Sequence, residues 1–321
     1  MTRLQPVSLR ERSPRLARVG FRATVVGFAV LLAGGCTSAS SAADDADQAA
    51  AGAANAAPER ASFHHVHLNV VAPQATVDFY EKFFGALPVN YRDRSDGLFT
   101  ERSFILLNPV PEPPRSNLGT TIWHIGWAGV DGATEFEWRT REGIGVQTPI
   151  TPLGDNFYMY FWGPDREVIE IYTGSKNHRF EHVHLVAHDV YTTISWFQEH
   201  FGLDPTRPIE PGVLGSTIRI DNVNLIVWTN PMGGPSRNAA EMPPEIGPEV
   251  GVTDGSAIDH IAFSYPDIEP VYDRLVAAGV EIVRGIETSE QYGHRSFFVR
   301  GPDGLLLEVV EEKPIPQGIW W

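Results

Sequence analysis

FHHVHLNV, at residues 63–70, returns 117 positions later as FEHVHLVA, at residues 180–187. The correspondence continues without a gap to Pro88 and Pro205. A repeat of this length indicates a structural unit that the chain contains twice, so each local assignment can be checked on both copies.

The repeated stretch has the alternation of a β-strand, in which successive side chains face opposite sides of the sheet. His65 and His67 would share one face, and the valine and leucine that alternate with them would share the other. A lone histidine at such a position is most simply a core residue with a hydrogen-bond partner, because buried polar groups normally have one. The recurrence of both as His182 and His184 favours a functional role instead.

Four further apolar strands carry a histidine or a glutamate on the side opposite their apolar residues. They are TIWHIGWAGV with His124, IDHIAFSY with His260, EVIEIY with Glu170 and GLLLEVV with Glu308. A glutamate on an edge strand would simply be exposed, but one inside so apolar a strand is costly to bury unpaired. The first half thus supplies His65, His124 and Glu170, and the second half supplies His182, His260 and Glu308. Two histidines and one carboxylate form the facial triad that holds iron(II) or a similar divalent ion.

Helical periodicity and glycine stop signals predict a helix after each of the histidine strands. The predicted helices cover residues 73–87, 134–142, 191–201 and 268–278. Each half is therefore predicted to run strand–helix–strands twice, an α+β arrangement whose sheet must curve into a cup for the ligands to meet. A Pro/Gly-rich connection of 27 residues, 230–256, has the length of a lid, a binding loop or a disordered segment.

The first 36 residues predict a signal peptide. Six arginines precede an apolar run of 11 residues, 23–33, which is too short to span a bilayer and ends in LAGGC. This end resembles the lipobox of a bacterial lipoprotein, which implies lipidation at Cys36, export, and attachment to the membrane of the cell envelope. The alternative is a cytosolic protein in which the apolar run is buried. Residues 37–60, rich in Ala, Ser and Asp, predict a disordered tether.

The cysteine count and the net charge limit the kinds of metal site and binding partner that can be expected. Cys36 is the only cysteine, so neither an intramolecular disulfide nor a cysteine-based metal site is expected. Removing the six arginines and one glutamate of the leader from 25 basic and 40 acidic residues leaves 19 and 39. That acidic balance disfavours nucleic acid and leaves a small molecule as the expected partner.

The motifs HVHL (twice), WHIGW, DHIAF, GPDREVIE and GPDGLLLE span residues 63–311. Together they resemble the vicinal oxygen chelate superfamily, which includes glyoxalase I, bleomycin- and fosfomycin-resistance proteins and extradiol dioxygenases. The resemblance implies four βαβββ modules paired into two domains, at residues 61–175 and 178–314, with curved mixed sheets. It also implies a divalent ion, Fe²⁺ first and Mn²⁺, Ni²⁺ or Zn²⁺ otherwise, that chelates two neighbouring oxygens of a small substrate.

The ligand set separates branches of this superfamily. Glyoxalase-type members have a second glutamate at positions that correspond to residues 106–107 and 225–227, where this chain has none. Fosfomycin-resistance enzymes share the three-ligand set but use cytosolic thiol cofactors, which an exported protein rarely meets. The resemblance therefore implies a ring-cleaving, dioxygenase-like reaction first and a glyoxalase-like lyase or isomerase second. A non-catalytic binder, like the bleomycin-resistance proteins, is the third alternative.

Extradiol dioxygenases also use an upstream histidine and a tyrosine before the turn for acid–base work. Tyr160 stands at the tyrosine position of the first half, where the second half has Phe298. His294 lies near the histidine position of the second half. His67 and His184 are candidates for hydrogen bonding to the metal ligands or for acid–base work.

The grouping of the six ligands stays open at this level. Each triad can form within one half, or His65 can complete the set of His260 and Glu308 across the halves, because members of the superfamily show both arrangements. The substrate, the metal and the oligomeric state are likewise open.

Overall fold

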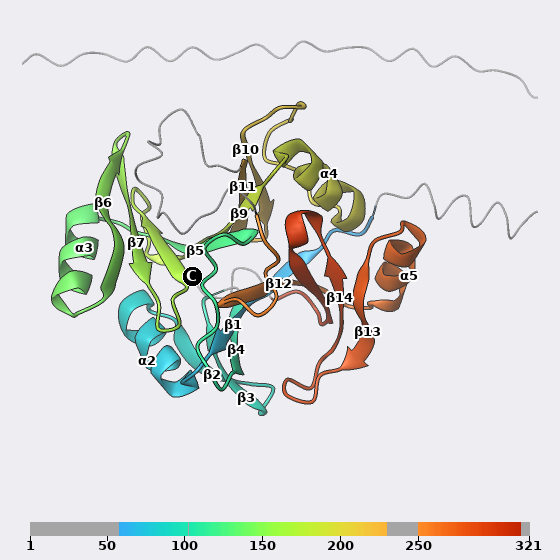
Figure 1. The fold of residues 1–321 in the computed structure, drawn as a ribbon, viewed down its shortest axis with the longest axis horizontal. Coiled ribbons are helices and arrows are strands. Elements are labelled where there is room, and N and C mark those ends of the chain that lie inside the picture. The colour runs from blue at the N-terminus through green and yellow to red at the C-terminus, as the bar shows by residue number, and fades with distance from the viewer. Residues whose placement is uncertain (1–57, 102, 230–249, 316–321) are drawn as a thin grey trace, which may run out of the picture. The chain divides into compact units, whose positions relative to one another are not determined.

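Strand–helix–strand modules follow one another along the chain (Figure 1). The structure, a computed structural model, describes residues 58–101, 103–229 and 250–315. The predicted signal peptide with Cys36, the tether up to residue 57 and the central part of the predicted connection, 230–249, lie outside the described residues. Export and lipid anchoring therefore stay predictions.

Four modules are present, and each begins with a strand that carries predicted ligands. The first comprises β1 (Ser62–Val70), α2 (Pro73–Phe84), β2 (Leu87–Tyr91), β3 (Ser95–Phe99) and β4 (Phe104–Pro109). The second comprises β5 (Ile122–Ala128), α3 (Gly132–Arg141), β6 (Gly145–Leu153), β7 (Asn156–Trp162) and β8 (Val168–Tyr172). The third comprises β9 (Arg179–Ala187), α4 (Val190–Phe201), β10 (Gly215–Ile220) and β11 (Val223–Thr229). The fourth comprises β12 (Ile258–Tyr265), α5 (Glu269–Ala277), β13 (Ile282–Thr288), β14 (Arg295–Arg300), the short η2 (Pro302–Gly304) and β15 (Leu306–Glu311).

The third module departs from the predicted βαβββ pattern. In the described part of the chain, two strands rather than three follow α4. An isolated bridge between Pro205 and Ile218 lies at the outer edge of β10. Proline lacks the N–H that a sheet ladder needs, which accounts for a bridge in place of a strand.

The modules combine into two mixed sheets, and each sheet takes one module from each half of the chain. The eight-stranded sheet has the order β13-β14-β15-β12-β1-β4-β3-β2, and the seven-stranded sheet has the order β10-β11-β9-β5-β8-β7-β6. Antiparallel pairing of β1 with β12 joins the first and fourth modules, and pairing of β5 with β9 joins the second and third. The halves 61–175 and 178–314 therefore do not each close a sheet of their own.

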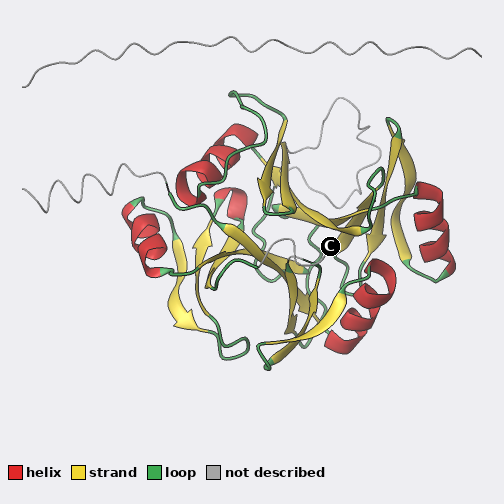
Figure 2. Ribbon diagram, turned by 180° about the vertical axis from the view of Figure 1, so that it is seen from behind, coloured by secondary structure: helices red, strands yellow, loops and turns green. Residues whose placement is uncertain are grey.

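The helices follow from their apolar faces. In α2, Val77, Tyr80 and Phe84 lie at helical spacing and are buried, and Gly85 ends the helix in the left-handed conformation that glycine adopts without strain. Figure 2 shows helices along the outer sides of the curved sheets. Apolar residues consequently face the helices, and the opposite, concave sides of the strands are left for the histidines.

Aromatic contacts link the two sheets into one core. The Tyr80 and Phe84 rings of α2 lie 5.8 and 4.8 Å from the ring of Trp127 in β5. The Phe201 ring of α4 lies 5.3 Å from that of Phe263 in β12. Each fully buried side chain of this size contributes about 1.5–3 kcal/mol. The sheets are thus packed together through α2 and α4.

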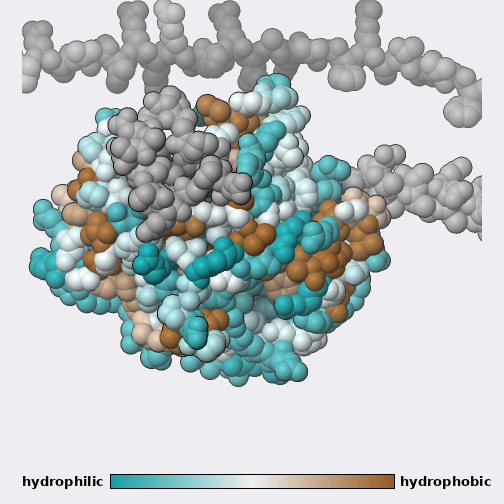
Figure 3. All heavy atoms as spheres, viewed as in Figure 1, coloured by the Kyte–Doolittle hydropathy of each residue, from teal (hydrophilic) through white to brown (hydrophobic). Residues whose placement is uncertain are grey.

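The surface is mixed. Figure 3 shows apolar groups separated by polar residues, one of them over α5 and β13, where Val276 and Val283 are exposed. Isolated exposed apolar residues are normal on a soluble surface. No helix among the described residues combines the length and the apolar character needed to cross a membrane.

Candidate metal centres

Four one-residue bulges stand where the modules join. Pairing of β1 with β12 skips His64 and Asp259, and pairing of β5 with β9 skips Trp123 and Glu181. A bulge leaves one residue unpaired, re-aims its neighbours, and is frequent beside functional sites. Each bulged residue directly precedes one of four predicted ligands: His65, His260, His124 and His182.

Site 1, in the eight-stranded sheet, joins His65 of β1, His260 of β12 and Glu308 of β15. Glu308 Oε2 lies 3.1 Å from His65 Nε2 and 3.2 Å from His260 Nε2. All three side chains are buried. His65 Nε2 forms no hydrogen bond despite this approach, so a buried polar nitrogen is directed at the space between the three groups.

Site 2, in the seven-stranded sheet, joins His124 of β5, Glu170 of β8 and His182 of β9. Glu170 Oε2 lies 2.9 Å from His124 Nε2 and 2.9 Å from His182 Nε2, and the two nitrogens are 3.1 Å apart. The three donor atoms form a nearly equilateral triangle, which has the shape of one face of an octahedron.

These spacings fit one divalent ion in each site. Imidazole and carboxylate donors bind such ions at about 2.0–2.2 Å, so two donors at right angles are about 3 Å apart. Two histidines and a carboxylate on one face are the donor set of facial-triad sites. The donor chemistry and the directed His65 nitrogen therefore fit a metal ion.

The six predicted ligands come together, but not in the sets that the halves of the sequence suggested. His65 lies with His260 and Glu308 rather than with His124 and Glu170. The reason is the exchange of modules between halves, because β1 pairs with β12 and not with β5. The arrangement across the halves, left open by the sequence, is the one that the structure has.

The bulged residues His64 and Asp259 orient the histidines of site 1. Asp259 Oδ1 lies 2.7 Å from His260 Nδ1, and Glu181 Oε2 lies 3.5 Å from His182 Nδ1. His64 Nδ1 lies 2.7 Å from His65 Nδ1, and its own Nε2 lies 3.2 Å from Glu312 Oε2. At His260 and His65 the hydrogen-bond partner at Nδ1 holds the proton there and leaves the Nε2 lone pair for an ion, whereas His182 Nδ1 makes no hydrogen bond to Glu181.

Burial and ion pairing act in opposite directions on these groups. Burial lowers the pKa of His260, but hydrogen bonds to Asp259 and Glu308 outweigh it and raise that pKa to about 9. In the same way, Glu170 and Glu181 overcome burial and raise the pKa of His182 to about 9. Burial raises the pKa of Glu308, yet its hydrogen bonds with His260 and His294 and the nearby His65 hold that pKa well below the usual value. Without an ion, each site is therefore a buried imidazolium–carboxylate pair.

Metal affinity should consequently rise with pH. An ion binds the neutral imidazole, so below pH 9 binding at either site must displace one proton from His260 or His182. Loss of one proton per ion gives about a tenfold gain in affinity for each pH unit up to about 9, and a plateau above it. Competition with a chromophoric chelator at pH 7, 8 and 9 measures the slope; a flat profile would contradict the charged state of the two histidines.

The predicted acid–base residues take different positions. His294 is buried with its Nε2 3.0 Å from Glu308 Oε1 and its Nδ1 3.2 Å from the Tyr91 hydroxyl, so it positions a ligand. The Tyr160 ring lies 5.2 Å from that of His124 in site 2. His67 Nδ1 lies 2.9 Å from His260 Nε2, and His184 has a nitrogen close to the three donors of site 2.

Site 1 opens on a cavity of about 610 Å³. His67, His260 and Glu308 line it, together with polar residues that include Asn69, Asn108, Glu290 and Tyr292. Apart from the two histidines, the one basic side chain among its described lining residues is Arg284, which lies over the Phe298 ring and 3.4 Å from Glu287. The cavity therefore has an acidic, hydrogen-bonding wall beside the three donors.

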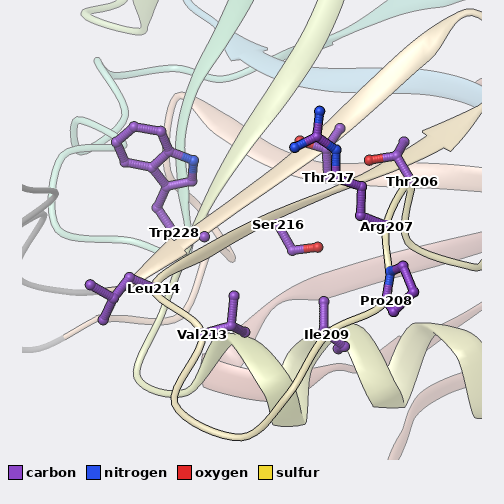
Figure 4. Close-up of a pocket in the computed structure, with 10 residues that line it drawn as sticks. Thr206, Arg207, Pro208, Ile209, Val213, Leu214, Ser216, Thr217 and Trp228 are labelled. Atoms are coloured by element: carbon purple, nitrogen blue, oxygen red, sulfur yellow. The ribbon is translucent and has the colours of Figure 1, made fainter.

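A second cavity, of about 600 Å³, lies at the edge of the seven-stranded sheet (Figure 4). Arg207, Ile209, Val213 and Trp228 are among its lining residues. The Trp228 ring also lies 5.4 Å from that of His184, so the cavity borders the surroundings of site 2.

Sequence reasoning missed the residues that hold the ligands in place. Strict alternation directs His64 and Asp259 away from the histidines that they contact, and only the bulges bring them together. Tyr292, whose hydroxyl lies 3.0 Å from His67 Nε2, belongs to the connection before β14. In the sequence, a polar or aromatic residue precedes every ligand histidine, and this pattern could have indicated the bulges.

Comparison with known proteins agrees with this fold. Residues 179–309 match the model of the Glyoxalase/Bleomycin resistance protein/Dioxygenase superfamily. Residues 179–309 therefore form a domain of this superfamily. Glyoxalase I from Zea mays matches at a TM-score of 0.59 and 16% identity, over 78% of this chain and 92% of that one. A variant of the same maize enzyme matches at 0.60 and 15% identity, over 82% and 96%.

A candidate dioxygenase from Bacillus subtilis has a similar fold, with a TM-score of 0.54, 14% identity, and coverage of 79% of this chain and 86% of that one. No curated protein matches the chain. At these identities the solved structures establish the fold alone. Proteins of the superfamily generally use divalent metals, and clusters of histidine and glutamate are present here at site 1 and site 2.

Proposed function

We propose that the protein is a divalent-metal-dependent enzyme that binds two neighbouring oxygens of a small substrate at site 1. The observation that carries the proposal is the convergence of His65 Nε2 and His260 Nε2 on Glu308 Oε2, at 3.1 and 3.2 Å, beside a polar cavity that His260 and Glu308 line. A structural ion would need the donors but not the adjoining cavity.

Some residues of site 1 would bind the ion, and others orient the side chains that bind it. His65, His260 and Glu308 would hold the ion, while Asp259 and His64 keep the imidazoles in the binding tautomer. When bound, a divalent ion acts as a Lewis acid that polarises the chelated oxygens and makes a neighbouring proton easier to remove. The acidic wall favours a polar substrate without net negative charge.

A lyase or isomerase reaction is favoured over ring cleavage, although the sequence put ring cleavage first. Ring cleavage of the extradiol type needs a histidine and a tyrosine that reach the substrate. His294 is engaged by Glu308 and Tyr91 and is absent from the cavity wall, and Phe298 occupies the tyrosine position. Glu290 and Tyr292 do line the cavity and supply groups for proton transfer.

Turnover should depend on Glu308. We expect Glu308→Gln to lower turnover at least about 100-fold, because it removes the charged ligand and leaves two buried histidines without their carboxylate. Glu311→Gln, on the same strand but paired with Arg295 outside the site, is the matched control and should be unaffected. Proton exchange and product formation on α-hydroxycarbonyl compounds and catechols can be followed by NMR under nitrogen and under air.

Each outcome of that screen selects one function. Turnover under nitrogen supports the lyase or isomerase, whereas strict dependence on air with a catechol restores the dioxygenase. Loss in Glu170→Gln instead of Glu308→Gln moves the reaction to site 2. Binding of compounds without turnover in any metal-loaded form favours the non-catalytic binder.

A further inference from the structure

His67 approaches site 1 more closely than an orienting residue needs to. It follows His65 by two positions in β1, so both side chains are on the concave side of the sheet. Its Nδ1 lies 2.9 Å from His260 Nε2, which is the spacing found between neighbouring ligands of one ion. The nitrogens of His65, His67 and His260 all lie within 4.8 Å of one another.

The hydrogen bonds of Tyr292 fix the tautomer of His67. The Tyr292 hydroxyl is 2.8 Å from the carbonyl oxygen of Leu107 and 3.0 Å from His67 Nε2. A carbonyl oxygen only accepts, so the single hydroxyl proton is donated to Leu107. Tyr292 must then accept from His67, whose Nε2 carries the ring proton. The Nδ1 lone pair of His67 consequently faces the donors of site 1.

A simple hydrogen bond from His260 to His67 does not survive metal binding. Asp259 occupies the Nδ1 side of His260 at 2.7 Å and holds its proton there. Once His260 Nε2 binds an ion, that nitrogen has no proton to donate to His67. The Nδ1 lone pair of His67 would then be buried 2.9 Å from His260 Nε2 without a proton donor. The ion itself is the partner that best satisfies this lone pair.

We propose that His67 Nδ1 is a fourth protein ligand at site 1, which makes the set three histidines and one glutamate. Leu106, which pairs with His67 across β1 and β4, offers no donor on the neighbouring strand. His184 has a related position in site 2, where it lies within 4.8 Å of the donors His124, Glu170 and His182, whereas the 4.8 Å group of site 1 comprises the three histidines without Glu308. The proposal rests on the proposed function in that it assumes a metal ion at site 1.

A fourth ligand narrows the chemistry. A six-coordinate ion with four protein ligands has two open positions, which suffice for the two oxygens of a chelating substrate. No further position then remains for dioxygen. The reaction at site 1 should therefore proceed equally well without air.

The ligand count can be measured with cobalt(II) as the probe. In a His182→Ala background, which disables site 2, X-ray absorption should count three imidazoles per cobalt ion. His67→Ala in that background should lower the count to two and weaken cobalt binding by about 100-fold. Tyr292→Phe should keep three imidazoles, because it removes the orienting hydroxyl and not the ligand. His188→Ala, at an exposed histidine paired with Asp303, is the matched control.

The results distinguish failure of this proposal from failure of the proposed function. Two imidazoles in the parent, unchanged by His67→Ala, would show that His67 only hydrogen-bonds the site. Absence of cobalt from both the parent and the wild-type protein would overturn the metal centre itself. Circular dichroism checks each fold, and His67→Gln replaces His67→Ala if the alanine variant does not fold. A count that falls from three to two in either variant supports the fourth ligand.

Discussion

Replacing His65 and His260 together by alanine should leave one metal ion per chain, whereas replacing His65 and His124 together should leave none. Both members of the first pair belong to site 1, where each lies within 3.2 Å of Glu308 Oε2. The second pair takes one ligand from each site. Two variants with the same number of lost histidines therefore differ by a whole ion.

The wild-type protein, reconstituted with Fe²⁺, Mn²⁺, Ni²⁺ or Zn²⁺ and passed over a desalting column, should carry two ions by elemental analysis. Single variants of His65, His124, His182 or His260 should each carry one. If the ligands grouped by halves of the chain, the pairs would exchange results, with none left in His65/His260 and one left in His65/His124. That exchange would contradict the pairing of β1 with β12.

The sequence contained enough information for the modules but not for their partners. Residues 63–70 and 180–187 predicted two strands, and the apolar spacing of Val77, Tyr80 and Phe84 predicted α2 to within a few residues. The edge strands β6 and β13 were not predicted, because GVQTPITPL and IVRGIET have little apolar alternation. Edge strands pack on fewer neighbours, so they need less apolar alternation than central strands.

Partner choice is a property of whole strand edges, which local patterns do not encode. His65 and His182 stand in nearly identical stretches, so nothing nearby tells whether β1 pairs with β5 or with β12. All six predicted ligands lie in the two clusters, because a buried histidine or glutamate in an apolar strand needs a partner wherever the strand ends up. Their grouping required the topology.

Space for a ligand is a second feature that the sequence did not reveal. Gly126 of β5 pairs with His182 on one side and Glu170 on the other. A Cβ added at Gly126 would lie 2.1 Å from His182 Cε1 and 2.3 Å from its Nε2. Carbon atoms in contact are normally about 3.5–4.0 Å apart. The imidazole of His182 thus occupies the volume that any other residue at position 126 would fill.

Gly126→Ala should therefore empty site 2 and leave site 1 loaded. The His182 ring must move by an ångström or more, while ligands have to stay within about 0.5 Å of their geometry to bind. We expect metal affinity at site 2 to fall at least about 100-fold, with an overpacking cost of about 1–3 kcal/mol in stability. Elemental analysis should give one ion per chain, and thermal melting should show a folded protein.

The eight-stranded sheet supplies the control for this prediction. Ala262 of β12 pairs with His65 and Glu308 just as Gly126 pairs with His182 and Glu170, and it already carries the methyl group. Ala262→Gly should thus keep both ions. It removes only the methyl group of Ala262, and the ligands of site 1 do not occupy the volume of that group. Two ions in Gly126→Ala would mean that His182 binds the ion from another rotamer. That result would contradict the position of the His182 ring in site 2. The double variant Gly126→Ala/Glu170→Gln tests which site has lost its ion. If it still carries one ion, as Gly126→Ala alone does, both changes act on site 2.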